Sequence, residues 1–211
     1  VTSDENRVSL TPAKVGLLVE NDHSVLVQAG AGHGASFTDD DYTAVGASIV
    51  DEASSVFDEA DMIVKVKEPQ PQEYEMFRQD QILFTFLHLA PEPALTMALL
   101  KSKVAGVAYE TVQEKDGSLP LLYPMSEMAG RLAPRVGARL LQNLSGGPGK
   151  MMGGVPGTEP PRMVVVGGGT VGLNAAMVAS ALGTHVTIVD INLDRLRYIS
   201  MVSRGAVDTV V

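Results

Sequence analysis

The stretch that decides the fold is Met163-Val164-Val165-Val166-Gly167-Gly168-Gly169-Thr170-Val171-Gly172. Its apolar run leads directly into the pattern Gly-x-Gly-x-x-Gly, which predicts a buried strand that turns sharply into a helix. Gly167 permits the tight turn, Gly169 lets backbone approach a pyrophosphate, and Gly172 lets the helix pack close to the strand. The free N–H groups and partial positive charge of the helix N-terminus would then face the phosphates.

A second apolar run, His185-Val186-Thr187-Ile188-Val189, ends in Asp190. Asp190 stands 18 residues after Gly172, close to the ~20-residue spacing of the acid that hydrogen-bonds the ribose 2′-hydroxyl of NAD. A lone glycine triplet also occurs in ordinary α/β turns, but the strand–helix–strand–acid context disfavours that alternative. The sequence therefore predicts a dinucleotide site, with NAD rather than NADP as the cofactor.

The residues after Gly172 suffice for only about half of a doubly wound domain, which has six strands when complete. The first residue is Val1 rather than Met. We therefore expect the 211 residues to be part of a longer enzyme. We also expect the chain by itself to be almost inactive, because hydride transfer tolerates little misplacement of the reacting groups.

Composition narrows the function class. Of the 211 residues, 45% are hydrophobic and 19% are charged, which is typical of a folded globular protein. The net charge of −9 argues against nucleic acid as a partner, because a phosphate backbone needs a basic patch. The absence of Cys excludes disulfides and thiolate catalysis and suits a reducing cytoplasm. No apolar run approaches the ~20 residues of a membrane span, and the four His residues lack metal-ligand spacing, so a small-molecule protein without a metal site is expected.

Upstream of the glycine pattern, strands alternate with helices, which predicts parallel sheets covered by helices. We expect an α/β fold with two Rossmann-like domains, of which the second, dinucleotide-binding domain is incomplete in this chain. The predicted substrate domain covers 1–124, a connecting helix 125–145, and the first half of the NAD-binding domain 146–211. The expected strands are 24–28, 47–50, 62–66, 82–86 and 104–108, and the expected helices are 11–21, 54–58, 91–101 and 125–143.

Two details of these helices carry separate expectations. Thr11-Pro12 is typical of a helix start, since Thr can cap and Pro suits the first helical position. Pro134 lies well inside the helix 125–143, where it removes a hydrogen bond and clashes with the preceding turn at a cost of ~3 kcal/mol. We expect a kink there, or two helices. Ser126 is placed to cap this helix or to lie near its start.

Polar side chains follow two of the predicted strands of the first domain. Lys67 follows the strand 62–66, and His88 follows the strand 82–86. Ligands of open α/β sheets bind at the carboxyl ends of the strands, where Lys67 could polarise a carbonyl and His88 could exchange a proton. The alternatives are a solvated lysine and a histidine satisfied by backbone. Arg7 could hold a substrate carboxylate, or simply pair with Glu5 or Asp4.

The order of several motifs resembles that of the alanine dehydrogenases over essentially the whole chain. The related proton-translocating transhydrogenases share the N-terminal motif and the glycine pattern. They are less similar near Leu87-His88-Leu89 and in the stretch Pro124–Arg131. The motifs that carry the resemblance are Glu5-Asn6-Arg7-Val8 with Thr11-Pro12, Gly30-Ala31-Gly32, Lys65-Val66-Lys67-Glu68-Pro69, Leu87-His88-Leu89, Ala108-Tyr109-Glu110-Thr111, Pro124-Met125-Ser126-Glu127-Met128-Ala129-Gly130-Arg131, and Gly167–Gly172 with Asp190.

The resemblance implies reversible, NAD-dependent oxidative deamination of L-alanine to pyruvate and ammonia. By position, Arg7 and Lys67 are then the residues that hold the substrate, and Lys67 and His88 are the catalytic ones. Ser126, Asp190 and Arg195 become contacts of the cofactor. The resemblance also implies a cytoplasmic homo-oligomer, a hexamer in this family. Two alternatives stay open at this stage, namely an NAD(H)-binding subunit of a transhydrogenase and an inactive fragment that only binds.

Overall fold

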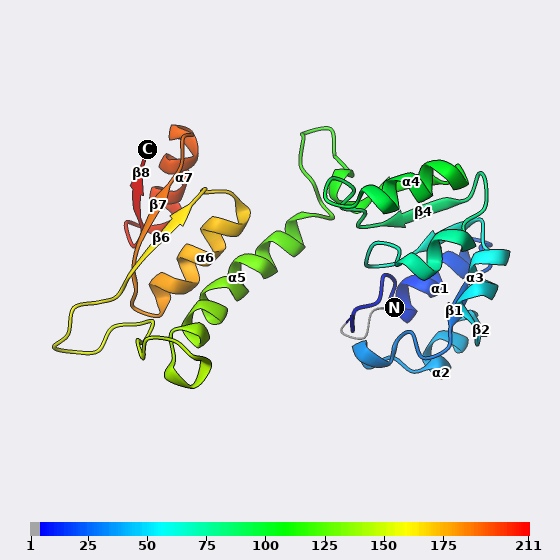
Figure 1. The fold of residues 1–211 in the computed structure, drawn as a ribbon, viewed down its shortest axis with the longest axis horizontal. Coiled ribbons are helices and arrows are strands. Elements are labelled where there is room, and N and C mark those ends of the chain that lie inside the picture. The colour runs from blue at the N-terminus through cyan, green and yellow to red at the C-terminus, as the bar shows by residue number, and fades with distance from the viewer. Residues whose placement is uncertain (1–4) are drawn as a thin grey trace. The chain divides into compact units, whose positions relative to one another are not determined.

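The computed structural model describes residues 5–211, which form two compact units that divide between Leu119 and Pro120 (Figure 1). All hydrogen-bonded strand pairs in this part of the chain are parallel, so the predicted α/β fold with parallel sheets is confirmed. Successive strands are joined through helical segments, because parallel neighbours need a long crossover connection. The functional domain boundaries drawn from the sequence stay a prediction.

The first unit holds two separate parallel sheets, with strand orders β1-β2 and β3-β4-β5. Each sheet has its own apolar core: Tyr42 and Val15 pack under the first, and Leu83, Leu95 and Phe57 under the second. The elements are α1 (Pro12–Glu20), β1 (Leu26–Gln28), η1 (His33–Ala35), α2 (Asp39–Thr43), β2 (Ser48–Val50), α3 (Ala53–Glu59), β3 (Met62–Val64), η2 (Pro71–Met76), β4 (Ile82–Thr85), α4 (Pro93–Ser102), β5 (Ala105–Ala108) and η3 (Tyr109–Thr111).

The ends of these elements differ from the sequence expectations by one or two residues. The strand expected at 62–66 ends at Val64, and the strand expected at 24–28 begins at Leu26. At the start of α1, Pro12 takes the first turn as expected, but the side chain of Thr11 makes no capping hydrogen bond. A reciprocal cap is found instead at α2, where the Thr38 side chain and Asp41 bond each other's backbone N–H groups.

The second unit is built around a three-stranded parallel sheet of order β6-β7-β8. Its core combines strand residues such as Val186 and Ile188 with Ala176 and Ala179, whose small side chains let α6 lie close to the sheet. The elements are α5 (Tyr123–Leu140), η4 (Asn143–Ser145), β6 (Arg162–Val166), α6 (Thr170–Ala181), β7 (His185–Val189), α7 (Leu193–Ser203) and β8 (Asp208–Val210).

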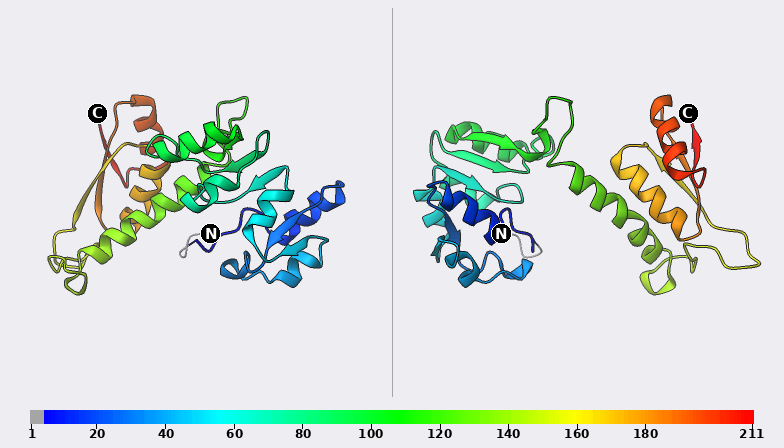
Figure 2. Two further views of the ribbon diagram at one scale, coloured as in Figure 1. Left: turned by 45° about the vertical axis from the view of Figure 1, so that its right-hand side comes forward. Right: turned by 180° about the vertical axis from the view of Figure 1, so that it is seen from behind.

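Helix α5 packs along α6 within this unit, and the two helices lie side by side in every view (Figures 1 and 2). It is one helix of 18 residues with Pro134 inside it, so the expectation of two helices is wrong. Pro134 is fully buried, and burial of its ring offsets the lost hydrogen bond. Four residues earlier, Gly130 brings the two helices into close contact, because a Cβ there would overlap the carbonyl oxygen of Val171.

Candidate functional site

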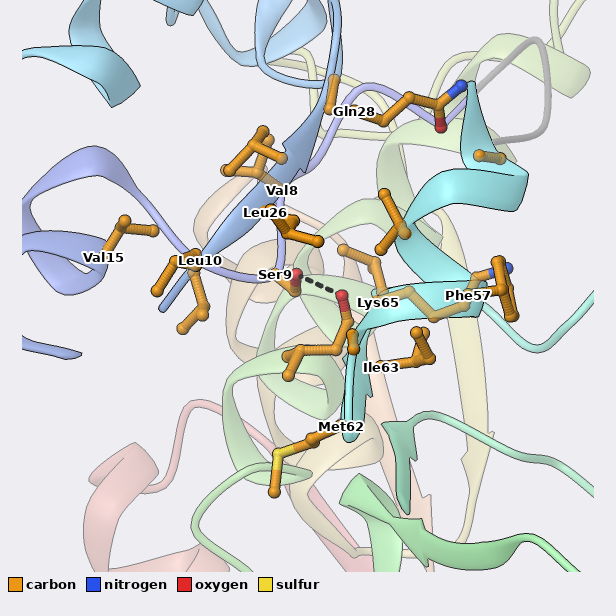
Figure 3. Close-up of a pocket in the computed structure, with 18 of the residues that line it drawn as sticks. Val8, Ser9, Leu10, Val15, Leu26, Gln28, Phe57, Met62, Ile63 and Lys65 are labelled. Atoms are coloured by element: carbon orange, nitrogen blue, oxygen red, sulfur yellow. Dashed lines mark hydrogen bonds between the residues drawn. The ribbon is translucent and has the colours of Figure 1, made fainter. Parts of the chain in front are cut away.

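The first unit contains a cavity of about 750 Å³, which lies between β1 and β3 (Figure 3). Its volume is within the ~300–1,000 Å³ of small-molecule sites. Most of the cavity is lined by apolar side chains, among them Leu26 and Ile63. A group of charged residues also lines it, which we call the charged cluster: Glu5, Arg7, Lys67 and Glu68.

Arg7 and Glu5 form a two-pronged ion pair in the charged cluster. The Arg7 Nε donates to Glu5 Oε1 at 2.7 Å, and an Arg7 terminal nitrogen donates to Glu5 Oε2 at 2.5 Å. The hydrogen bonds from Arg7 hold the pKa of the Glu5 carboxyl below its usual value, and the positive charge of Lys67 adds to this. Arg7 thus adopts a geometry that suits a carboxylate, and one of the sequence alternatives, pairing with Glu5, is what the structure shows.

Lys67 lies just beyond β3 and is partly exposed. Its Nζ is 3.4 Å from Glu68 Oε2. Its carbonyl oxygen accepts a hydrogen bond of 3.0 Å from the Thr85 hydroxyl, which is fully buried on β4. Two residues earlier, Lys65 Nζ lies 2.5 Å from the buried carboxylate of Glu73. The segment that presents Lys67 is therefore anchored at Lys67 itself and two residues before it.

His88 follows β4 and has a left-handed backbone with φ of 45°. Its backbone N–H donates to Glu110 Oε1 at 2.8 Å, and the Leu87 N–H donates to the same oxygen at 3.1 Å. Its ring stacks on Phe86, and half of the side chain is exposed. The structure thus gathers Arg7 and Lys67 at one cavity, whereas His88 is not among the residues that line it.

In the second unit, the glycine pattern forms the turn between β6 and α6. Gly167 has φ of +96°, the left-handed region in which a side chain is strained. A Cβ on Gly172 would overlap the carbonyl oxygen of Gly167, so the helix reaches the turn only because residue 172 lacks a side chain. Gly169 is the N-cap residue of α6, and a Cβ there would point into open space.

Asp190 and Arg195 both bond this turn. The Asp190 carboxylate accepts the Gly168 N–H at 2.6 Å and the Asn192 N–H at 2.8 Å. These bonds, with Asn192 contributing most, lower the pKa of Asp190 from its usual value. Arg195 donates from Nε to the Gly168 carbonyl oxygen and lies over the ring of Tyr198.

These residues fit a bound dinucleotide. No side chain caps the N-terminus of α6, so its first N–H groups stay available to a phosphate, and the space over Gly169 leaves room for one. Asp190 presents a carboxylate at the end of β7, where a ribose is held in this fold. Of the two alternatives predicted for Ser126, the structure shows the second: Ser126 does not cap α5 but lies in its first turns, with its N–H bonded to the Leu122 carbonyl.

Two family models account for nearly the whole chain. "Alanine dehydrogenase/PNT, N-terminal domain" matches residues 1–129, and "Alanine dehydrogenase/PNT, C-terminal domain" matches residues 133–211. The chain belongs to the alanine dehydrogenase/PNT family. The family and the Rossmann-like fold together indicate a dinucleotide cofactor.

Relatives within the alanine dehydrogenase/PNT family support this assignment along the full chain. The alanine dehydrogenase of Methanococcus maripaludis is 52% identical over 210 residues, which are 100% of this chain and 56% of the relative. A solved structure named L-alanine dehydrogenase matches 99% of this chain at 45% identity with a TM-score of 0.88, and 58% of its own length is covered. The chain thus spans little more than half the length of the relatives it matches.

The transhydrogenase from Sinorhizobium meliloti has a TM-score of 0.78 over the whole chain at 21% identity, a likeness that shows the shared fold alone. Within residues 5–211, no helix has the length and apolar character needed to cross a membrane. The same residues contain no group of three or more His, Asp or Glu side chains placed to hold a metal ion.

Three polar residues of the site region have no role predicted from the sequence. Glu110 belongs to the motif Ala108-Tyr109-Glu110-Thr111, and the other two are Thr85 and Glu73. Thr85 lies in an apolar strand, where a buried hydroxyl needs a hydrogen-bond partner. The sequence therefore contained a sign that the Thr85 hydroxyl is hydrogen-bonded. Gln70 and Glu73 have the spacing of a reciprocal cap, which the structure forms.

Proposed function

We propose that this chain is part of an NAD-dependent L-alanine dehydrogenase and carries its substrate-holding residues. The observation that supports this best is the convergence of Arg7 and Lys67 on one cavity, in a chain that is 52% identical to an alanine dehydrogenase along its whole length. In the proposed reaction, L-alanine, NAD⁺ and water give pyruvate, ammonium, NADH and a proton. The preferred redox cofactor is NAD because Asp190 would repel a 2′-phosphate.

Each candidate residue has a distinct proposed role. Arg7 binds the carboxylate of the substrate through its planar guanidinium group. Lys67 holds and polarises the oxygen at C2 of pyruvate, and its partial exposure and anchored backbone suit that task. His88 exchanges the proton at the amino or carbonyl group. NAD held at the turn Gly167–Gly172 would supply the acceptor for the hydride that leaves C2 of alanine.

On the cofactor side, Gly167, Gly169 and Gly172 form the turn that admits the pyrophosphate. Asp190 hydrogen-bonds the adenosine ribose, and Arg195 and Ser126 are further contacts of the cofactor. We also propose a cytoplasmic homo-oligomer, a hexamer by resemblance to the family.

The test is NADH formation from L-alanine by the longest natural polypeptide that contains these residues, with D-alanine and L-serine as control substrates. The Lys67→Ala variant should lose turnover, whereas Lys101→Ala should keep it, because Lys101 is an exposed lysine of α4 that pairs with the exposed Glu75. A polypeptide that binds NADH but shows no alanine-dependent turnover would refute the proposed function.

A further inference from the structure

The proposed reaction assigns no role to the glycine-rich motif that follows β1. We call this motif, residues 30–34, the glycine loop; its sequence is Gly-Ala-Gly-His-Gly. Ala31 of the glycine loop and Gln28 at the end of β1 line the same cavity as Arg7. The glycine loop therefore lies at the carboxyl end of a strand that borders the candidate site, and its glycines come close to the segment that carries Arg7.

The glycine loop is anchored to α2 and to the apolar core. Gly30 has φ of +73°, and its N–H donates to the carboxylate of Asp39, the first residue of α2, at 2.9 and 3.2 Å. At Gly32, a Cβ would lie 2.7 Å from the Phe37 carbonyl oxygen and 2.8 Å from the ring of Tyr42. Tyr42 is itself buried. The backbone of the glycine loop is therefore held in one place from below.

Gly34, the last residue of the glycine loop, lies directly against Asn6. A Cβ on Gly34 would be 2.5 Å from Asn6 Oδ1, 2.8 Å from Asn6 Cα and 2.9 Å from Asn6 Cβ. Rotation of the Asn6 side chain could relieve the first of these overlaps but not the second, because the Cα belongs to the backbone. Asn6 directly precedes Arg7. The backbone that carries Arg7 thus rests on a surface that exists only because residue 34 has no side chain.

Two hydrogen bonds hold the other side of the same segment, just after Arg7. The Ser9 hydroxyl donates to the Val64 carbonyl at 3.1 Å, the bond that is dashed in Figure 3. The Tyr42 hydroxyl donates to the Leu10 carbonyl at 2.9 Å. Arg7 therefore lies between the contact with Gly34 on one side and these two bonds on the other, so its place at the cavity depends on all three.

We propose that Gly34 is a positioning residue for Arg7, because its contact with Asn6 sets where the guanidinium group lies at the cavity. This inference rests on the proposed function, in which Arg7 binds the carboxylate of the substrate. A two-pronged pair of guanidinium and carboxylate depends on direction as well as distance, so a displaced Arg7 binds its ligand with fewer well-formed hydrogen bonds.

A side chain at position 34 should displace the segment of Arg7 rather than unfold the unit. Gly34 and Asn6 are both exposed, whereas the glycine loop is anchored to buried Tyr42. The exposed segment around Asn6 is then the part that yields when a Cβ is added. The effect of Gly34→Ala should therefore appear in the binding of the substrate and not mainly in stability.

The experiment measures NADH formation from L-alanine by the longest natural polypeptide that contains these residues. Gly34→Ala should raise the KM for L-alanine about 10-fold, which corresponds to the loss of one hydrogen bond to a charged group. The kcat and the Kd of NADH should stay nearly unchanged, because Arg7 holds the carboxylate in the ground state and in the transition state alike. A merely structural role predicts the reverse, namely fewer active molecules and an unchanged KM.

Three further variants isolate the contact. Gly16→Ala makes the same change in α1, where the nearest atom is Val45 Cβ at 3.4 Å, and should leave the KM unchanged. His33→Ala removes an exposed side chain of the glycine loop itself and should also leave it unchanged. In an Arg7→Lys background the planar fork is absent, so adding Gly34→Ala should raise the KM by less than ~2-fold if Gly34 acts through the guanidinium group.

An unchanged KM in Gly34→Ala would overturn the inference, and so would an increase that is just as large in the Arg7→Lys background. If Gly34→Ala does not fold, Ser9→Ala decides: loss of its hydrogen bond should raise the KM about 3-fold, and an unchanged value would overturn the inference. Absence of alanine-dependent turnover in the wild type would refute the proposed function instead. The Arg7 Nε–H signal in ¹⁵N NMR spectra of the 211-residue chain then decides: it should shift in Gly34→Ala but not in Gly16→Ala, and equal shifts would overturn the inference.

Discussion

Three glycines of the second unit allow a comparison in which one substitution has opposite effects at different sites. Each lies inside a helix, so replacing it with Ala gains about 1 kcal/mol of helix propensity. At Gly172 the new Cβ would overlap the Gly167 carbonyl oxygen, and at Gly130 it would overlap the Val171 carbonyl oxygen. At Gly137 the nearest atom is Met152 Cε at 3.5 Å, an ordinary contact.

The size of each stability change depends on which atoms must move to make room for the new Cβ. Overpacking costs about 1–3 kcal/mol, and the upper end applies at Gly172 and Gly130 because backbone, not a flexible side chain, stands in the way. After the gain in propensity, Gly172→Ala and Gly130→Ala should each lower the free energy of unfolding by about 2 kcal/mol. Gly137→Ala should raise it by roughly 0.5–1 kcal/mol. Gly172→Ala should also weaken NADH binding, since relief of the overlap displaces the turn at Gly167.

Urea unfolding followed by far-UV circular dichroism measures these differences, and the chain has no Trp to report instead. The midpoint should fall for the first two variants and rise for the third, with an unchanged dependence on urea. If Gly172→Ala were as stable as Gly137→Ala, the close approach of α6 to its turn would not be a feature of the molecule in solution, and the reasoning would fail.

Three further predictions concern the proposed site. In the complete enzyme, Asp190→Ser should relax the preference for NAD, which a comparison of kcat/KM for NAD and NADP measures; equal values already in the wild type would contradict the assignment. Lys67→Ala and His88→Ala should each lower kcat by at least ~100-fold while leaving the Kd of NADH nearly unchanged. The control is His33→Ala, since His33 is exposed and does not line the cavity, and near wild-type turnover in either test variant would remove that residue from the mechanism. Hydrogen bonds hold the pKa of folded Asp190 below its usual value, so the stabilisation that its carboxylate provides is complete above about pH 4 and is lost as the pH falls through the folded pKa. The free energy of unfolding, measured from pH 6 to pH 2.5, should therefore drop more in the wild type than in Asp190→Asn. Parallel curves for the two proteins would contradict this role of Asp190.

The parts of the structure that short-range rules govern were predictable from the sequence. The Gly167–Gly172 turn follows from local backbone sterics, and the place of Lys67 beyond the end of β3 follows from the rule that ligands collect at strand ends. Alternation of apolar runs gave the parallel strands to within one or two residues. In these cases a few neighbouring residues contain the whole physical cause.

The remaining features depend on partners that are distant in the sequence. The backbone N–H of His88 bonds Glu110, 22 residues away, and no local pattern reveals that pair. Pro134 is tolerated inside α5 because tertiary packing buries it, whereas the helix rules alone predicted a kink or two helices. The division of the first unit into two sheets was also not predictable, because strand order is set by packing and not by strand propensity.

The ion pair of Glu5 with Arg7 has a consequence for substrate affinity. On the proposed assignment, Glu5 is an internal competitor of the substrate, tethered two residues from the guanidinium group that both carboxylates would bind. Short tethers give effective concentrations in the millimolar range, so a free carboxylate displaces Glu5 only when its own concentration is comparable. The half-saturating substrate concentration would then lie in the same millimolar range, and Glu5→Gln, which removes the competing charge, would lower it.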